Sequence, residues 1–292
     1  GDPRDLHSFP TRRSSDLTTR LTWIWTNAPP PVGLPWLRSA AVSNLPGYFS
    51  ASLTWADFDQ DGDMDLVLAG STNTPNPSNF KTRVCRNDGG LNFTPLADVL
   101  PDLADASLAW ADFDRDGAMD VCVSGTTNGS SGYLTGVYRN NGAGQFTSVP
   151  AGLPGITRGL VRWGDVDNDG WPDLLLCGII RVGNTMTNLT KLFRNNTDGT
   201  FSEYSSFAPL NSPRGFLVDV DNDGRLDVLL VGTMPGDMLA TPVARFYLNR
   251  GEGQFLDIGP TLPSGNPAPT LVAVGDFDRD GRVDVVDRKS VV

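Results

Sequence analysis

The sequence is poor in histidine and glutamate, two of the residues that enzymes use for proton transfer. It contains one histidine, His7, and only two glutamates, Glu203 and Glu252. Histidine and carboxylic acids carry most general acid–base catalysis. The chain also lacks the G-x-S-x-G turn of serine hydrolases and the glycine-rich phosphate loop of nucleotide-binding proteins. These absences count against several large classes of enzyme.

Long apolar runs and helical periodicity are absent as well. No run approaches the ~18 apolar residues that a membrane-spanning helix requires. Hydrophobic residues make up 39% of the chain, and its 32 glycines and 22 prolines suit many short strands joined by turns. The formal net charge of −11 argues against a nucleic acid as partner, because phosphates repel an acidic surface.

Cysteine is scarce, and the three cysteines form no metal-binding or redox motif. Cys122 and Cys177 lie in the apolar strand patterns VCV and LLLCG, and the third is Cys85. We predict buried free thiols, with a disulfide between two of them as the alternative.

Both ends of the chain have an unusual origin in our interpretation. Residues 7–17, HSFPTRRSSDL, can be back-translated into an oligonucleotide that resembles a common sequencing adapter. The last six residues, DRKSVV, can be back-translated into the reverse complement of the stretch that encodes TRRSSDL. We interpret residues 1–17 and 287–292 as translated adapter, expected to be disordered, with a disordered basic tail as the alternative. The natural chain is then expected to continue beyond both ends, and a missing signal peptide carries no information.

The rest of the chain is a repeat built around an aspartate motif. The motif occurs five times, as DFDQDGDMD from Asp57, DFDRDGAMD from Asp112, DVDNDGWPD from Asp165, DVDNDGRLD from Asp219 and DFDRDGRVD from Asp276. The spacings are 55, 53, 54 and 57 residues. Regular recurrence over such a period is typical of a solenoid or a propeller.

Each repeat contains four short strand signals. A tryptophan stands two residues before three of the motifs, and an apolar run that ends in glycine follows the first four: DLVLAG, DVCVSG, DLLLCG and DVLLVG. A polar loop, a strand that ends near asparagine and a short strand with phenylalanine come next. Four antiparallel strands in about 55 residues predict a blade of an all-β propeller. Stacked blades bury faces that one sheet leaves exposed.

The repeat boundaries predict one domain over residues 18–286. Complete blades are expected at about 45–97, 100–150, 153–207 and 210–258. A partial blade is expected at 262–286, and residues 18–43, with LTWIW, are interpreted as the outer strands of an earlier blade. Whether the partial blades pair or leave an open edge stays undecided at this point.

These units resemble FG-GAP/VCBS repeats, the family that includes the integrin α-subunit propeller and many secreted bacterial proteins. The resemblance covers roughly residues 18–286 and rests on five motifs at regular spacing. It implies a propeller with a metal-binding loop between the first two strands of each blade. Family propellers usually have seven blades, so a longer parent protein is expected.

The aspartate motif itself predicts a calcium site. In all five copies, positions 1, 3, 5 and 9 are aspartate and position 6 is glycine. Ca²⁺ takes six to eight oxygen ligands, and glycine permits the sharp turn that brings alternate carboxylates together. Position 7 varies freely, which suits ligation through its backbone carbonyl. Positions 2 and 8 are apolar and are expected to point into the blade.

The predicted calcium ligands fall into five loops. They are Asp57, Asp59, Asp61, Asp63 and Asp65 in the first; Asp112, Asp114, Asp116, Ala118 and Asp120 in the second; Asp165, Asp167, Asp169, Trp171 and Asp173 in the third; Asp219, Asp221, Asp223, Arg225 and Asp227 in the fourth; and Asp276, Asp278, Asp280, Arg282 and Asp284 in the fifth.

Three alternatives to this site are weaker. An EF-hand loop needs a carboxylate at position 12, where the first four copies have Leu68, Val123, Leu176 and Leu230. An acidic turn without metal would hold like charges that repel by about 1 kcal/mol per pair even in water. Mg²⁺ is less suitable because four protein carboxylates leave little room for its waters. We expect calcium to clamp the first two strands of each blade, with a role in ligand binding or catalysis as the alternative.

The predicted function is that of an extracellular binding or adhesion module for protein or carbohydrate ligands, and not of an enzyme. The connections between the second and third strands vary most, as STNTPNPSNF, TTNGSSGYLT, IIRVGNTMTN and TMPGDMLATP. Their polar character suits ligand contact and equally a solvated loop. The alternative function is part of a secreted polysaccharide-degrading enzyme. Calcium sites of the extracellular type fill at millimolar calcium, which favours a secreted or surface location.

Overall fold

The computed structural model describes residues 45, 47–72, 79–90, 92–97, 99–127, 132–236, 242–260, 272–277 and 281–287. All described residues belong to one compact unit, Asn44–Val292. The predictions for residues 1–17 and 18–43 therefore lie outside the described residues, as does the predicted adapter segment 287–292 except for Asp287, which lies in a strand. Within the described ranges, no helix is long and apolar enough to cross a membrane.

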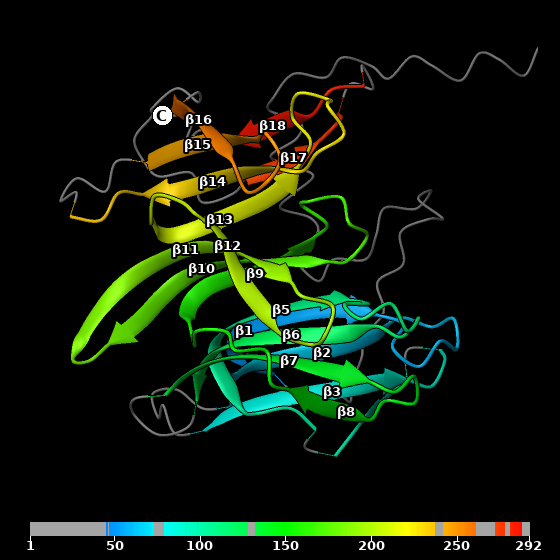
Figure 1. The fold of residues 1–292 in the computed structure, drawn as a ribbon. Helices are drawn as coiled ribbons and strands as arrows, with labels where there is room; N and C mark the ends of the chain where they lie inside the picture. Colours follow the sequence, from blue (N-terminus) through cyan, green and yellow to red (C-terminus); the bar gives the residue numbers. More distant parts are fainter. Residues whose placement is uncertain are drawn as a thin grey trace, which may run out of the picture. The chain divides into compact units, whose positions relative to one another are not determined.

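The described residues form consecutive antiparallel sheets (Figure 1). Each of the first four sheets has four strands that pair in sequence order, and we call these sheets the first to fourth blades. Their strands are β1 (Phe49–Ala56), β2 (Asp65–Ser71), β3 (Phe80–Asn87) and β4 (Phe93–Pro95); β5 (Leu103–Ala111), β6 (Asp120–Thr127), β7 (Tyr133–Asn140) and β8 (Phe146–Val149); β9 (Thr157–Gly164), β10 (Asp173–Val182), β11 (Thr185–Asn195) and β12 (Phe201–Ser206); and β13 (Asn211–Val218), β14 (Asp227–Thr233), β15 (Pro242–Asn249) and β16 (Phe255–Pro260). A two-stranded sheet, β17 (Val272–Gly275) with β18 (Asp284–Asp287), follows. The predicted fold class, an all-β propeller of four-stranded antiparallel blades, is confirmed.

The second strand of each blade is buried along its first six residues. This holds for β2, β6, β10 and β14, which carry the runs DLVLAG, DVCVSG, DLLLCG and DVLLVG. A strand that is covered on both faces has a continuous apolar run and not an alternating pattern. The runs therefore mark the layer at which one blade packs against its neighbours.

A glycine ends each buried run because the first strand bulges toward it. In the second blade the pairing of β5 with β6 shifts between Ala104 and Ser107. A Cβ atom on Gly125 would lie 2.7 Å from the Ala104 carbonyl oxygen, and one on Gly232 would lie 2.7 Å from the Asn211 carbonyl oxygen. Glycine in a strand often marks such a close backbone approach.

Aromatic side chains join each blade to the next. Phe58 of the first blade stacks on Trp110 of the second, with ring centroids 6.2 Å apart. Phe113 of the second blade stacks on Trp163 of the third at 6.3 Å. Trp163 also donates its indole N–H to the Ala109 carbonyl of the second blade, at 3.1 Å. Trp110 and Trp163 therefore contribute to the core between blades, whereas the equivalent Trp55 of the first blade is 46% exposed.

All three cysteines are buried and free, as predicted, so the disulfide alternative is wrong. Cys122 packs in the apolar cluster between the second and third blades, and Cys177 packs in the cluster between the third and fourth. Burial raises the pKa of the Cys177 thiol to about 12. The thiolate, which is the reactive form, is therefore not populated at neutral pH.

The connection between the second and third strands of the third blade differs from the predicted polar loop. β10 and β11 continue as a long hairpin up to the pair Val182 and Thr185 (Figure 1). Only Gly183 and Asn184 remain in the turn, and Gly183 has a φ of 60°. A two-residue hairpin turn requires positive φ, which glycine adopts without strain. Of the other three connections, residues 73–78, 128–131 and 237–241 lie outside the described residues.

Candidate metal centres

Each aspartate loop joins the first strand of a blade to the second. The ninth residue of the motif is the first residue of β2, β6, β10, β14 and β18. The predicted strand–loop–strand arrangement is therefore present, and a helix–loop–helix site is not. The loops lie at one end of the sheets, where the backbone reverses.

The aspartate at position 1 accepts two hydrogen bonds from the backbone of its own loop. In the second loop, Asp112 Oδ1 accepts a hydrogen bond from the Asp116 backbone N–H at 3.0 Å, and its Oδ2 accepts one from Gly117 N–H at 3.0 Å. The same pair of bonds occurs in the first, third and fourth loops. Gly117 has a φ of 92°, and the glycines at position 6 of the other loops also have positive φ. The prediction that glycine permits a sharp turn here is confirmed.

The aspartate at position 9 ties three segments together. Asp120 is fully buried. Its Oδ2 accepts the Phe113 backbone N–H at 3.1 Å, and its Oδ1 accepts the Asn140 backbone N–H at 2.8 Å. Asp65, Asp173 and Asp227 make the same two bonds. Position 9 thus holds the loop, the second strand and the end of the third strand in one arrangement.

Carboxylate oxygens from each of the first four loops converge. Oxygens of positions 1, 3 and 9 lie within 4.8 Å of one another in the second, third and fourth loops, and those of positions 1, 3 and 5 do so in the first. The groups are Asp112, Asp114 and Asp120; Asp165, Asp167 and Asp173; Asp219, Asp221 and Asp227; and Asp57, Asp59 and Asp61. Asp65, Asp116, Asp169 and Asp223 stay outside these groups, and the last three each accept a bond from the position 7 backbone N–H. In the fifth loop, Asp278 and Asp280 lie outside the described residues.

Two oxygens at position 3 are buried without a partner. Asp59 Oδ1 and Asp114 Oδ1 are shielded from solvent and accept no hydrogen bond. A buried polar atom is costly to leave unsatisfied. A hard cation such as Ca²⁺, which prefers carboxylate oxygens, would satisfy each of these atoms if one ion were bound in each loop. The residues present therefore fit the metal that the motif predicts.

The residues at position 7 are placed by their backbone. The N–H groups of Asp63, Ala118, Trp171 and Arg225 donate to the Oδ1 of the position 5 aspartate at 2.8–3.0 Å. Their side chains differ in environment, since Ala118 is buried and Arg225 donates to the Asn249 carbonyl. Arg282 lies in the fifth loop among the described residues. Ligation through the carbonyl of position 7 stays a prediction.

The apolar side chains at positions 2 and 8 behave differently from each other. At position 2, Phe58, Phe113 and Val166 are buried and pack against the following blade, as expected. Phe277 is 56% exposed, because no following blade covers it within the described residues. Position 8 is intermediate in burial in the other loops, but Met64 is 52% exposed, so the prediction that position 8 points into the blade is wrong for Met64. In the fourth loop, Leu226 packs against the apolar cluster between the third and fourth blades, beside Gly164.

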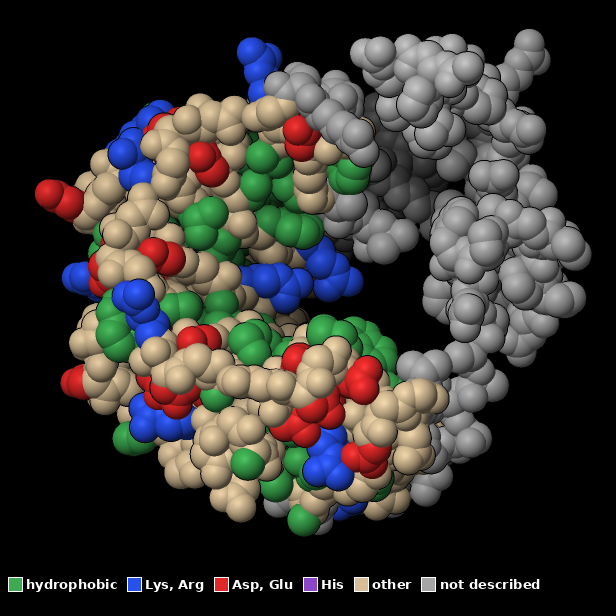
Figure 2. Space-filling model, turned by 90° about the vertical axis from the view of Figure 1, so that its right-hand side faces the viewer, with side chains coloured by type: hydrophobic (Ala, Val, Ile, Leu, Met, Phe, Trp, Pro, Cys, Tyr) green, Lys and Arg blue, Asp and Glu red, His purple; other side chains and the backbone are tan. Residues whose placement is uncertain are grey.

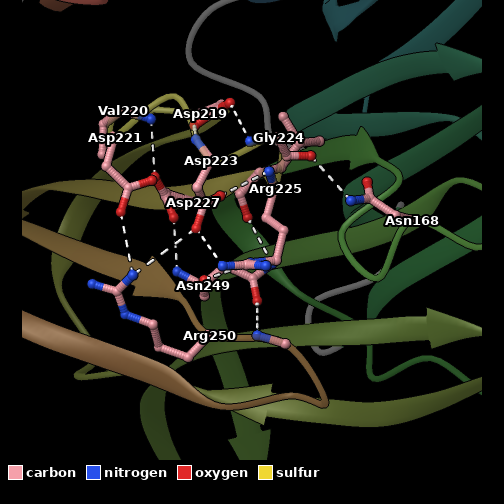
Figure 3. A network of polar contacts seen from close by, with 12 residues as sticks. Asn168, Asp219, Val220, Asp221, Asp223, Gly224, Arg225, Asp227, Asn249 and Arg250 are labelled. Atoms are coloured by element: carbon pink, nitrogen blue, oxygen red, sulfur yellow. Dashed lines mark hydrogen bonds and ion pairs between the residues drawn. The ribbon is translucent and has the colours of Figure 1, made fainter.

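An arginine accompanies each of the first four loops. Arg194 pairs with Asp167 at 2.6 Å and with Asp169 at 2.9 Å. Arg139 pairs with Asp114, while the equivalent N–O distances are 4.0 Å for Arg86 with Asp59 and 3.3 Å for Arg250 with Asp221. Figure 2 shows acidic groups with basic side chains beside them on one face, and Figure 3 shows Arg250 and Arg225 against the fourth loop. Each guanidinium offsets part of the charge that the aspartates bring together.

Replacing one of these arginines is expected to raise the affinity for calcium and to lower the stability of the metal-free protein. Arg139→Gln removes a positive charge next to the second loop, so we expect calcium to bind that loop about two- to fivefold more tightly, in proportion to the modest value of a half-exposed ion pair. Without calcium the same variant should melt slightly lower than the parent. Calorimetric titration and melting in chelator check the two halves. Weaker calcium binding in Arg139→Gln would contradict a role in offsetting the charge of the loop, and would show that the arginine helps to form the site.

The buried aspartates predict a pH dependence of the metal-free protein. Burial raises the pKa of Asp120 to about 7 and that of Asp173 to about 6, with neighbouring aspartates adding to the effect. The folded state therefore binds these protons more tightly than the unfolded state, and stability falls as pH rises from about 4 to about 7. Calcium binding requires the deprotonated carboxylates, so its stabilising effect grows over the same range. Melting curves in EDTA should move to lower temperature between pH 5 and pH 8, and curves in calcium should not follow them.

Two kinds of functional residue were not singled out from the sequence. One is the arginine next to each loop, and the other is the asparagine that ends the third strand, Asn87, Asn140, Asn195 and Asn249. Each asparagine is buried and donates from Nδ2 to the position 8 carbonyl of its own loop. The recurrence of Asn at the same place in four repeats was the available signal, but a strand end near asparagine is common at turns and did not indicate a role.

Comparisons with known proteins give a family and several distant structural likenesses. The comparison with curated proteins finds no match. Among solved structures, a complex described by the names BT0996 and RGII and a structure described as "Glycoside hydrolase" are each 12% identical and match over 85% of this chain and 92% of theirs, with TM-scores of 0.45 and 0.44. A fructofuranosidase from Schwanniomyces occidentalis in complex with fructosylnystose is 10% identical over 68% of this chain and 43% of its own, with a TM-score of 0.38. These values are too low to assign an activity.

The assignment to a family is based on the repeats. The family model described as "FG-GAP-like repeat" matches residues 57–123, 125–176 and 219–286, which is more than half of the chain. The matched segments contain all five aspartate loops whole. This chain belongs to the FG-GAP-like repeat family.

Proposed function

We propose that the protein is a calcium-binding module in which Ca²⁺ clamps the first two strands of each blade. The observation that carries the proposal is the convergence of carboxylate oxygens in four successive loops, with Asp59 Oδ1 and Asp114 Oδ1 buried and unpartnered. The aspartates at positions 1, 3, 5 and 9 would hold the ion, together with the carbonyl of position 7. Bound calcium supplies two positive charges to a loop that concentrates four carboxylates.

A titration of calcium into the metal-free protein tests this proposal. We expect one site for each intact loop, and one site fewer in Asp112→Asn, which keeps the hydrogen bond to one backbone N–H but loses a charged ligand. Asp257→Asn is the matched control, because Asp257 is an aspartate outside the loops that pairs with Arg245. Saturable binding that is equal in the parent and in Asp112→Asn would place the ions elsewhere.

The proposed role of this module is extracellular binding of protein or carbohydrate ligands. Calcium sites of the extracellular type fill at about 10⁻⁴–10⁻³ M, which supports a location outside the cell. The long hairpin of the third blade supports ligand contact, because its tip exposes Val182 by 60% and Met186 by 58% among polar residues. Exposed apolar side chains grouped at a projecting element are typical of an interaction site.

Most described carboxylates outside the loops are paired with cations, which supports binding over hydrolysis. A glycosidase needs two carboxyl groups on either side of the scissile bond. Among the described residues, Asp102 pairs with Lys81, Asp105 with Arg158 and Glu203 with Lys191. Carboxylates engaged with cations in this way are poorly suited to proton transfer. The polysaccharide-degrading enzyme remains the alternative function.

Glycan-array and protein pull-down measurements, each with calcium and with EDTA, test the binding role. We expect a calcium-dependent ligand and expect the double substitution of Val182→Ser and Met186→Ser to weaken its capture. Leu256→Ser is the control, since Leu256 is similarly exposed, at 51%, but lies on β16 away from the hairpin. Turnover of a polysaccharide by this chain would favour the enzyme instead.

A further inference from the structure

The side chain at position 4 of a loop reaches the next loop along the chain. Asn168 Nδ2 donates to the Gly224 carbonyl at 3.0 Å, and Asn222 Nδ2 donates to the Gly281 carbonyl at 3.0 Å. In the first loop, Gln60 Nε2 donates to the Gly117 carbonyl at 2.6 Å. Position 4 has a positive φ in the first four loops, between 58° and 62°. Asparagine tolerates this left-handed conformation better than most residues.

A second contact runs in the opposite direction. The asparagine that ends the third strand of one blade donates from Nδ2 to the position 2 carbonyl of the preceding loop. Asn140 reaches Phe58 at 2.6 Å, Asn195 reaches Phe113 at 2.8 Å and Asn249 reaches Val166 at 2.8 Å. These asparagines are buried, so the bonds are shielded from water. The first and second loops, and likewise the third and fourth, are therefore linked at two points.

Both links end on residues that also bond predicted calcium ligands. Gly224 accepts the bond from Asn168 on its carbonyl and donates its N–H to Asp219 Oδ2 at 2.9 Å (Figure 3). Val166 accepts the bond from Asn249 on its carbonyl and donates its N–H to Asp173 Oδ2 at 2.9 Å. When the carboxylates of a loop are held in place, the backbone carbonyls that accept bonds from the neighbouring blade are therefore held in place as well.

We infer that the calcium sites of consecutive blades are coupled, with position 4 and the strand-ending asparagine as the positioning residues. The inference rests on the proposed calcium function. When one loop is ordered by its ion, the peptide that holds the neighbouring loop is ordered too, so the neighbour loses less conformational freedom on binding. Coupling of this kind is reciprocal, and loading either loop raises the affinity of the other.

The third loop offers a reporter for one site. Trp171 occupies position 7 there, whereas the other loops have Asp63, Ala118, Arg225 and Arg282. Terbium is a luminescent substitute for calcium, and a tryptophan at its site sensitises its emission. The difference in emission between the parent and Trp171→Phe isolates the third loop from tryptophans elsewhere. Its midpoint in a terbium titration is the quantity to measure.

The experiment is a double-mutant cycle across the link between the third and fourth loops. Asp219→Asn disables the fourth loop but keeps an oxygen for the Gly224 N–H. We expect it to weaken terbium binding at the third loop by about three- to tenfold, which is the range of one hydrogen bond. In the background of Asn168→Ala, which cuts the exposed link, the same substitution should have a clearly smaller effect. Asn196→Ala is the control, because Asn196 is an exposed amide of the same blade that bonds only within its turn.

Each outcome separates the two levels of inference. The coupling is overturned if the third loop binds terbium saturably but its midpoint is unchanged by Asp219→Asn. It is also overturned if Asp219→Asn shifts the midpoint equally with and without Asn168. In both cases the proposed calcium sites are unaffected. Absence of saturable emission that depends on Trp171 overturns the calcium site and the coupling together. A loss of coupling in Asn196→Ala equal to that in Asn168→Ala would show that the link is not specific.

Discussion

Removing calcium is expected to lower the melting temperature of the protein by about 10–20 °C. An ion that binds only the folded state adds RT ln(1 + [Ca²⁺]/Kd), which is about 1.4 kcal/mol per site at 1 mM calcium for a Kd of about 10⁻⁴ M. Four such sites contribute about 5–6 kcal/mol, and each kcal/mol moves the melting temperature by about 2–4 °C in a domain of this size. The effect is large because the same site recurs in the first four blades.

Differential scanning calorimetry in 1 mM calcium and in EDTA measures this shift. Returning calcium should restore the transition, and equimolar magnesium should not, because Mg²⁺ keeps its waters and fits a crowded carboxylate site poorly. Asp112→Asn should reduce the shift by the share of one site. A transition that is equal in calcium and EDTA would rule out the clamp as a source of stability.

Replacing Asp173 by alanine is expected to destabilise the protein by about 3–5 kcal/mol even without calcium, because two buried N–H groups lose their acceptor. Asp173 is 1% exposed and accepts the backbone N–H groups of Val166 and Asn195, each at 2.9 Å. These bonds join the third loop, β10 and β11. The expected fall in melting temperature in EDTA is about 6–20 °C.

Asp169→Ala is the matched variant for this second prediction. Asp169 is a predicted ligand in the same loop, but it is exposed and bonds the Trp171 N–H and Arg194. We expect Asp169→Ala to lose calcium response at the third loop and to melt close to the parent in EDTA. Asp173→Ala should lose both. Equal melting of the two variants in EDTA would show that position 9 acts as a ligand alone.

Much of the fold and the site could be predicted from residues that every blade shares. Asp120 and its equivalents mark the start of the second strand, and Gly117 and its equivalents mark the turn. The apolar runs after them mark the buried strand. Such features repeat because each blade forms the same strand–loop–strand structure. Five copies of one pattern then separate required positions from variable ones.

Contacts between blades could not be predicted in the same way. Asn140 and Phe58 are 82 residues apart, and Asn168 and Gly224 are 56 residues apart. The exposure of Met64 and Phe277 also depends on which blade lies beside each of them. The extended β10–β11 hairpin was missed because its polar alternation resembles that of a solvated loop.

The sequence by itself determined the repeat, the four-stranded blade and the crowding of aspartates in one loop per blade. These follow from local patterns of charge, glycine and apolar residues, which act over a few neighbours in the chain. The tertiary structure decided which carboxylates converge, which arginine offsets them and which asparagine links one loop to the next. Those choices depend on the packing of one blade against another, and packing brings together side chains that no local pattern relates.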